Sequence, residues 1–117
     1  MTTHYVAEEE DIPVGGSRLV TIEGKEIGIF RERDGFYAVL NVCPHMRAPV
    51  CLGRVEGTME APTPATLDYN HERRVLRCPW HHWEFELDTG KAVCRSVRQR
   101  LKTYPVRLED RKIFVEL

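Results

Sequence analysis

Apolar and polar residues alternate along most of this chain of 117 residues. Alternation with a period of two is typical of β-strands that bury one face and expose the other. No stretch of useful length repeats its apolar residues every three to four positions, so we expect no substantial helix. The pattern predicts strands over residues 17–22, 26–31, 36–42, 74–77, 83–87, 91–94, 102–108 and 112–116.

Turn sequences separate these predicted strands, since glycine, aspartate and asparagine suit tight turns. Such turns are predicted at Glu23-Gly24-Lys25, Asp34-Gly35 and Asp88-Thr89-Gly90. Residues 6–12 are compatible with one helical turn that ends at Pro13, and their acidic run is most simply a solvated face. Residues 57–73 contain Pro62 and Pro64 and are predicted to form a long loop. Many short strands joined by turns predict an all-β fold, a small antiparallel β-sandwich or barrel.

The composition fits a single small domain, which we place at residues 1–117. The chain has 17 basic and 18 acidic residues and a formal net charge of -1. This balance argues against binding to nucleic acid or to an anionic membrane through bulk charge. The first residues lack the basic and apolar regions of a signal peptide, and no apolar run is long enough to span a membrane. We therefore expect a cytoplasmic protein.

Cysteine and histidine occur together in two short boxes, Cys43-Pro44-His45 and Cys78-Pro79-Trp80-His81. Without an export signal, disulfides are not the default, and a metal site is the better explanation for such boxes. The other two cysteines, Cys51 and Cys94, are most simply buried in the core. Cys43, His45, Cys78 and His81 are therefore the candidate metal ligands.

The spacing within the boxes favours a dinuclear centre over a single zinc ion. In an extended segment, Cys43 and His45 point to the same side with α-carbons about 6.5 Å apart. That reach suits a cluster in which the cysteine holds one iron and the histidine the other. Zinc accepts two cysteines and two histidines, but its boxes usually place two to four residues between paired ligands. A structural zinc module remains the alternative.

Formal charge predicts how such a cluster behaves. Two ferric ions, two sulfides and two thiolates sum to zero, and neutral imidazoles add nothing. An all-cysteine cluster carries two more negative charges and accepts an electron less readily. The midpoint potential should therefore lie within about -150 to +300 mV, above that of plant-type ferredoxins.

The two boxes resemble those of Rieske-type [2Fe-2S] proteins, above all the soluble bacterial Rieske ferredoxins. The resemblance continues in the residues after each box, Ala48-Pro49-Val50-Cys51 and Trp83-Glu84-Phe85, and in more distant flanks. Those flanks are Ile12-Pro13-Val14-Gly15-Gly16, Asp34-Gly35, Asp88-Thr89-Gly90-Lys91 and Tyr104-Pro105-Val106.

The resemblance implies an antiparallel β fold with a cluster-binding subdomain at one tip and cluster-binding loops at residues 43–51 and 78–85. It implies one [2Fe-2S] cluster per chain. Carried over by position, Cys43 and Cys78 hold the inner iron, and His45 and His81 hold the outer iron, nearest to solvent.

The resemblance also implies a role. Proteins of this kind are one-electron carriers, not enzymes by themselves, and pass electrons from a flavin-dependent reductase to a terminal oxygenase. The small subunit of a nitrite reductase-type complex is the alternative within the family.

Several residues depart from the family pattern or have two interpretations. Arg47 and His82 stand where the boxes usually have glycine. Trp83 and Phe85 stand where high-potential respiratory Rieske proteins have serine and tyrosine hydroxyls, which predicts a midpoint in the lower part of the Rieske range. Four arginines are predicted to form either a basic rim for an acidic partner or a solvated face. They are Arg47, Arg95, Arg98 and Arg100. Four apolar residues are predicted either to contribute to a docking surface or to pack in the core. They are Met46, Val50, Trp80 and Trp83.

Overall fold

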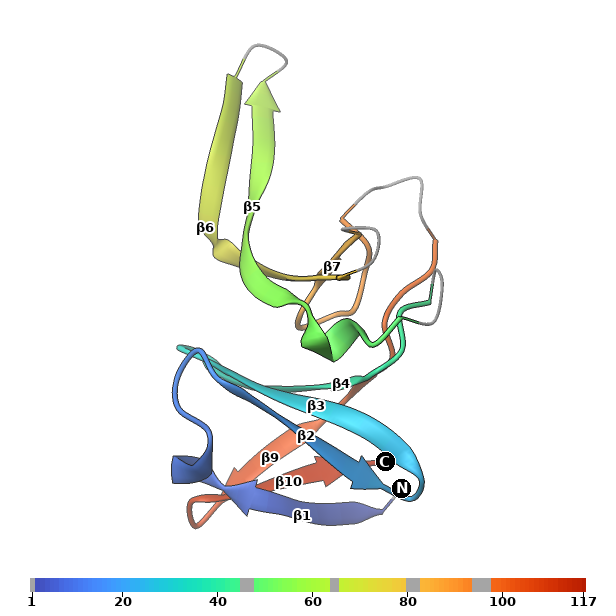
Figure 1. The fold of residues 1–117 in the computed structure, drawn as a ribbon. Helices are drawn as coiled ribbons and strands as arrows, with labels where there is room; N and C mark the ends of the chain where they lie inside the picture. Colours follow the sequence, from blue (N-terminus) through green and yellow to red (C-terminus); the bar gives the residue numbers. More distant parts are fainter. Residues whose placement is uncertain (1, 45–47, 64–65, 80–82, 94–97) are drawn as a thin grey trace. The chain divides into compact units, whose positions relative to one another are not determined.

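The chain divides into two compact units, each built from antiparallel strands (Figure 1). The computed structural model describes residues 2–44, 48–63, 66–79, 83–93 and 98–117. Unit 1 comprises Met1–Asn41 and Lys102–Leu117, and unit 2 comprises Val42–Leu101. Both cysteine–histidine boxes belong to unit 2.

Unit 1 contains two sheets. The first has the order β1-β10-β9, formed by Thr3–Glu8, Lys112–Glu116 and Val106–Glu109. The second has the order β2-β3-β4-β8, formed by Ser17–Ile22, Lys25–Glu32, Gly35–Leu40 and Thr103–Tyr104. All these pairings are antiparallel. The two ends of the chain meet in unit 1, where Thr2 and Leu117 exchange two backbone hydrogen bonds of 2.8 and 2.9 Å (Figure 1).

The core of unit 1 consists of aliphatic side chains from both of its sheets. Ile27 and Ile29 of β3 and Ile113 and Val115 of β10 are completely buried. On β10, Ile113 and Val115 alternate with more exposed residues, as expected for a strand with one covered face. Burying a side chain of this size stabilises the fold by about 1.5–3 kcal/mol.

The described part of unit 2 contains one sheet of order β5-β6-β7, formed by Arg54–Thr63, Thr66–Arg77 and Glu84–Glu86. A 3₁₀ turn, η2, spans Val50–Leu52 immediately before β5. The base of the β5–β6 hairpin pairs Arg54 with Arg77 and Val55 with Leu76. After a register shift, the hairpin continues over residues 58–63 and 66–70, in the long strands labelled β5 and β6 in Figure 1.

The all-β antiparallel fold is confirmed, and several predicted strands have the expected bounds. The strands predicted at 17–22 and 112–116 match β2 and β10. The strand predicted at 91–94 is wrong as an element: Lys91 and Ala92 form isolated bridges to Arg100 and Phe85. The helical turn predicted within 6–12 is a 3₁₀ turn, η1, at Glu9–Asp11, which follows β1.

The loop predicted at 57–73 is also wrong, because the described residues 57–63 and 66–73 belong to β5 and β6. Pro62 has no backbone N–H to donate, which argued against a strand. In the structure, Pro62 lies at the second register shift, between Glu60 and Thr63. A bulge near the hairpin tip tolerates the missing donor, so the strand pairing continues on both sides of it.

Candidate metal centre

The first box lies in a loop that one backbone hydrogen bond closes. β4 ends at Leu40, and Cys43 follows with no exposed surface. The Cys43 amide donates to the Ala48 carbonyl at 2.8 Å, which encloses the residues between them. Ala48 and Val50 are completely buried and anchor the returning chain.

The second box lies in a loop of the same size with the same closure. β6 ends at Arg77, and Cys78 is completely buried. The Cys78 amide donates to the Trp83 carbonyl at 2.8 Å, and β7 begins at the next residue. Cys43 and Cys78 therefore occupy equivalent places, each at the start of a loop closed onto the fifth residue after it.

Gly53 brings the base of the first loop against the base of the second. A Cβ atom at Gly53 would lie 1.8 Å from the Arg77 carbonyl oxygen, far inside van der Waals contact. The Gly53 amide donates to the Val50 carbonyl at 2.9 Å, which ends η2, and Arg54 then pairs with Arg77. Only glycine allows this approach, so Gly53 is a position with a strict structural requirement that the sequence reasoning missed. The only indication of this position in the sequence is a glycine two residues after Cys51.

An ion pair crosses the base of the second loop. Arg77 Nη2 donates to Glu84 Oε2 at 2.7 Å, and these residues are also opposite each other in the β6–β7 ladder. Their side chains are 37% and 21% exposed. A short charge-assisted bond that is partly shielded from water holds the two ends of the loop together better than a fully exposed pair.

Buried apolar side chains flank the second loop on both sides in the sequence. Leu76, Phe85 and Leu87 are almost completely buried. The Trp83 and Phe85 rings lie with centroids 6.3 Å apart and planes tilted by 44°. Neither side chain carries a hydroxyl, which is the feature behind the predicted low midpoint potential.

The residues that the structure describes fit an iron–sulfur cluster. Thiolates are the preferred ligands of such clusters, and both candidate cysteines are buried within one unit on matching loops. The other two candidate ligands, His45 and His81, lie outside the described residues. Within the described ranges, no group of three or more histidine, cysteine, aspartate or glutamate side chains could hold a metal ion.

The remaining candidates from the sequence have mixed outcomes. Cys51 is buried, as predicted, and the described cysteines Cys43, Cys51 and Cys78 form no disulfide. Val50 is wrong as part of an apolar docking surface, because it is completely buried. The next-but-one residue, Leu52, is 67% exposed instead. The predictions for the following residues lie outside the described ranges: Met46, Arg47, Trp80, His82, Cys94 and Arg95.

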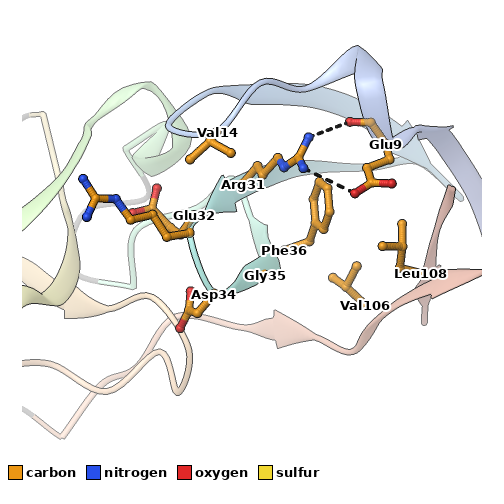
Figure 2. A pocket seen from close by; sticks show the side chains of 10 residues that line it. Glu9, Val14, Arg31, Glu32, Asp34, Gly35, Phe36, Val106 and Leu108 are labelled. Atoms are coloured by element: carbon orange, nitrogen blue, oxygen red, sulfur yellow. Dashed lines mark hydrogen bonds and ion pairs between the residues drawn. The ribbon is translucent and has the colours of Figure 1, made fainter.

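A hollow in unit 1 has a different chemistry (Figure 2). Charged and apolar side chains line it, and none of the described lining residues is a cysteine or histidine. Arg31 Nη1 donates to the backbone oxygens of Glu9 and Ile12 at 3.1 and 3.0 Å, and Nη2 contacts Glu9 Oε1 at 3.3 Å. The guanidinium also lies 5.1 Å from the centre of the Phe36 ring. Arg31 thus fastens η1 to β3 and is engaged in holding the fold.

Comparison with known proteins identifies the family of the chain. The chain matches the Rieske [2Fe-2S] domain family over residues 2–105. It is 34% identical over 107 residues to the ferredoxin component of the naphthalene 1,2-dioxygenase system of Pseudomonas aeruginosa, with 92% of this chain and 88% of that protein covered. The chain belongs to the Rieske [2Fe-2S] domain family. Since its relatives are ferredoxin components, it is an electron carrier and not an enzyme by itself.

Solved structures support the same fold. The ferredoxin of carbazole 1,9a-dioxygenase from Nocardioides aromaticivorans IC177 matches with a TM-score of 0.77 and 23% identity, covering 98% of this chain and 97% of that one. An NADH-dependent nitrite reductase small subunit from Mycobacterium tuberculosis matches with a TM-score of 0.74 and 23% identity, covering 97% and 93%. The predicted Rieske-type fold is therefore confirmed. No helix among the described residues is long and apolar enough to cross a membrane.

Proposed function

We propose that Cys43, His45, Cys78 and His81 hold one [2Fe-2S] cluster per chain, and that the protein carries single electrons from a flavin-dependent reductase to a terminal oxygenase. The observation that carries this proposal is the pair of buried cysteines at equivalent places in two loops closed by the same backbone bond. Relatives that are ferredoxin components of dioxygenase systems support the choice of partners. The cytoplasm is the proposed location.

The bound cluster would supply one reversible electron. The chain's own residues would keep the free-energy cost of rearrangement small, because their positions would change little between the two redox states. Both cysteines lie at the closed ends of their loops, and the Arg77–Glu84 bond and the close approach at Gly53 restrain the bases. A restrained site needs little rearrangement when the charge of the cluster changes.

The proposed midpoint potential lies in the lower part of the Rieske range. Trp83 and Phe85 carry no hydroxyl that could donate a hydrogen bond toward the cluster sulfurs, and such bonds stabilise the reduced state. A redox titration should give a midpoint below about +150 mV, within the span known for Rieske centres. A higher value would overturn this part of the proposal.

A second role, as the small subunit of a nitrite reductase-type complex, is favoured only by the fold shared with such a subunit. Stable co-purification with a large catalytic chain would select it over the free carrier. A structural zinc module is the third candidate and would give a colourless protein.

Matched cysteine variants test the ligand set. We expect the purified protein to be red-brown, to contain equal amounts of iron and acid-labile sulfide, and to be reduced by dithionite. Cys43→Ala and Cys78→Ala should abolish the visible absorption. Cys51→Ala is the control, because Cys51 is also buried but is not a proposed ligand. If Cys51→Ala removed the cluster while Cys43→Ala retained it, the proposed ligand set would be wrong.

A further inference from the structure

Three exposed cations of unit 2 form no salt bridge with the acidic residues that the structure describes. Lys91, Arg98 and Arg100, which we call the basic patch, are all exposed. Among the described residues, no salt bridge involves any of them. In the same unit, Arg77 is paired with Glu84 at 2.7 Å, so the absence of partners is a property of the patch and not of the whole unit.

The backbone places two of these cations directly opposite each other. Lys91 and Arg100 form an antiparallel bridge. Residues opposite each other in such a bridge point to the same face with Cβ atoms about 4.5–5.5 Å apart, and like charges there are destabilising. Arg98 is two residues before Arg100 and adds a third positive charge nearby. The fold thus tolerates a repulsion that a neutral residue at either position would remove.

Two described carboxylates, Asp88 and Glu86, accept hydrogen bonds in the adjacent turn. Asp88 Oδ1 accepts a hydrogen bond from the Thr89 amide at 2.8 Å. Glu86 Oε2 accepts one from the Thr89 hydroxyl at 3.0 Å. These bonds shape the turn from β7 to Lys91 and leave the patch facing solvent.

Anchoring bonds hold the basic patch in place beside the second loop. Leu101 is buried, and its amide donates to the Gly90 carbonyl at 2.8 Å. The Lys91 carbonyl accepts a bond from the Glu86 amide at 2.7 Å, and Ala92 bridges to Phe85 of β7. Since neighbouring strands are about 4.8 Å apart, Arg100 lies about 10 Å from β7, which begins where the second loop closes.

We propose that the basic patch is a docking surface for an acidic face of the protein that accepts the electron. This rests on the proposed function, because it assigns the patch to the electron-transfer step. Opposite charges across an interface accelerate the encounter and orient the partners. An acidic partner would also relieve the repulsion between Lys91 and Arg100, and it would bring the second loop close to the acceptor.

Two double variants with equal charge changes test the proposal. Lys91→Gln/Arg100→Gln removes two of the three charges of the patch. Lys25→Gln/Lys112→Gln removes two exposed cations of unit 1 that form no salt bridge with any described residue. The measurement is stopped-flow oxidation of the dithionite-reduced holoprotein by ferricyanide, an anionic oxidant that takes one electron and becomes ferrocyanide. The rate is followed against ionic strength, and thermal unfolding is recorded for each protein.

We expect the patch variant to react roughly threefold to tenfold more slowly than wild type at low salt and to converge with it at high salt, because salt screens the attraction. The unit 1 variant should stay near wild type. The Tm of the patch variant should be unchanged or higher, since a like-charge pair is removed. Equal slowing in both double variants, or a lower Tm of the patch variant, would overturn the proposal. A protein without a reducible chromophore would instead refute the proposed function.

Discussion

At the scale of single residues, Gly53 allows the bases of two loops to lie in contact because it has no side chain. Its α-carbon lies so close to the Arg77 carbonyl that the two ligand loops share a common base. Cys43 and Cys78 are candidate ligands because a thiol near a histidine has few structural explanations, and their role stays a prediction. Gly53 was not predicted, since a close approach between distant segments leaves no local pattern in the sequence.

Replacement of Gly53 by alanine should loosen both loops. The new Cβ atom would force Arg77 and the adjacent Cys78 to move, at a cost of about 1–3 kcal/mol or more for such overpacking. We expect Gly53→Ala to lower the iron content per chain well below that of wild type, measured by iron analysis and visible absorption.

Gly15→Ala is the matched control for this prediction. Gly15 has a φ of +85°, so alanine costs about 1–2 kcal/mol of backbone strain, but its Cβ atom would meet open space in unit 1. This variant should keep its full complement of iron. Equal iron loss in both variants would mean that general destabilisation, and not the contact with Arg77, removes the cluster.

The burial of Val50 could not be predicted from the sequence. A valine beside a ligand box is equally compatible with a docking surface and with core packing. The structure buries it completely and leaves Leu52 exposed, because η2 turns the chain between the two residues.

Among the elements, strands with clear turn signals were predicted best. The Glu23-Gly24 turn matches the hairpin of β2 and β3, in which Glu23 and Gly24 both have positive φ. The β5–β6 hairpin was not predicted, because Pro62 and Pro64 favour a loop and the pairing of the two strands is not visible in the sequence. β1 was missed because its partner, β10, is at the other end of the chain.

The Arg77–Glu84 pair allows a test at the element scale, because it bridges β6 and β7 beside a proposed ligand. Arg77→Gln would leave the negative charge of Glu84 near the cluster and should lower the midpoint potential. Glu84→Gln would leave the positive charge of Arg77 and should raise it. The double variant should return toward the wild-type value. Redox titration of the three holoproteins provides the measurement.

A purely structural role for this pair would give another pattern. Loosening the loop by either route would shift both single variants in the same direction. Shifts of the same sign would therefore contradict an electrostatic contribution from these two residues.

At the scale of the whole molecule, the two units differ in their described structure. Unit 1 has an aliphatic core and holds both chain ends by the bonds between Thr2 and Leu117. Unit 2 contains both boxes, and the described part of its sheet consists of β5, β6 and β7. The sequence predicts one Rieske domain over residues 1–117, and this assignment stays a prediction. The division into two units depends on contacts between distant segments that a local pattern does not reveal.

Removal of the cluster should affect the two units unequally. Binding energy from the cluster stabilises the residues that bind it. In the iron-free protein, we expect faster hydrogen exchange at the amides of Cys43 and Cys78, which close the two loops. The amides of Ile27 and Ile29 in the core of unit 1 should keep their protection. Unchanged exchange at both cysteines would show that the loops are ordered without the cluster.

The central claim is that two cysteines and two histidines of this chain hold a [2Fe-2S] cluster. Pulsed electron paramagnetic resonance of the dithionite-reduced protein, grown with ¹⁵N-labelled histidine, tests it most directly. The account predicts a signal from the reduced cluster with strong ¹⁵N couplings from two imidazole ligands. A reduced cluster without histidine nitrogen couplings, or a colourless protein with no signal, would contradict it.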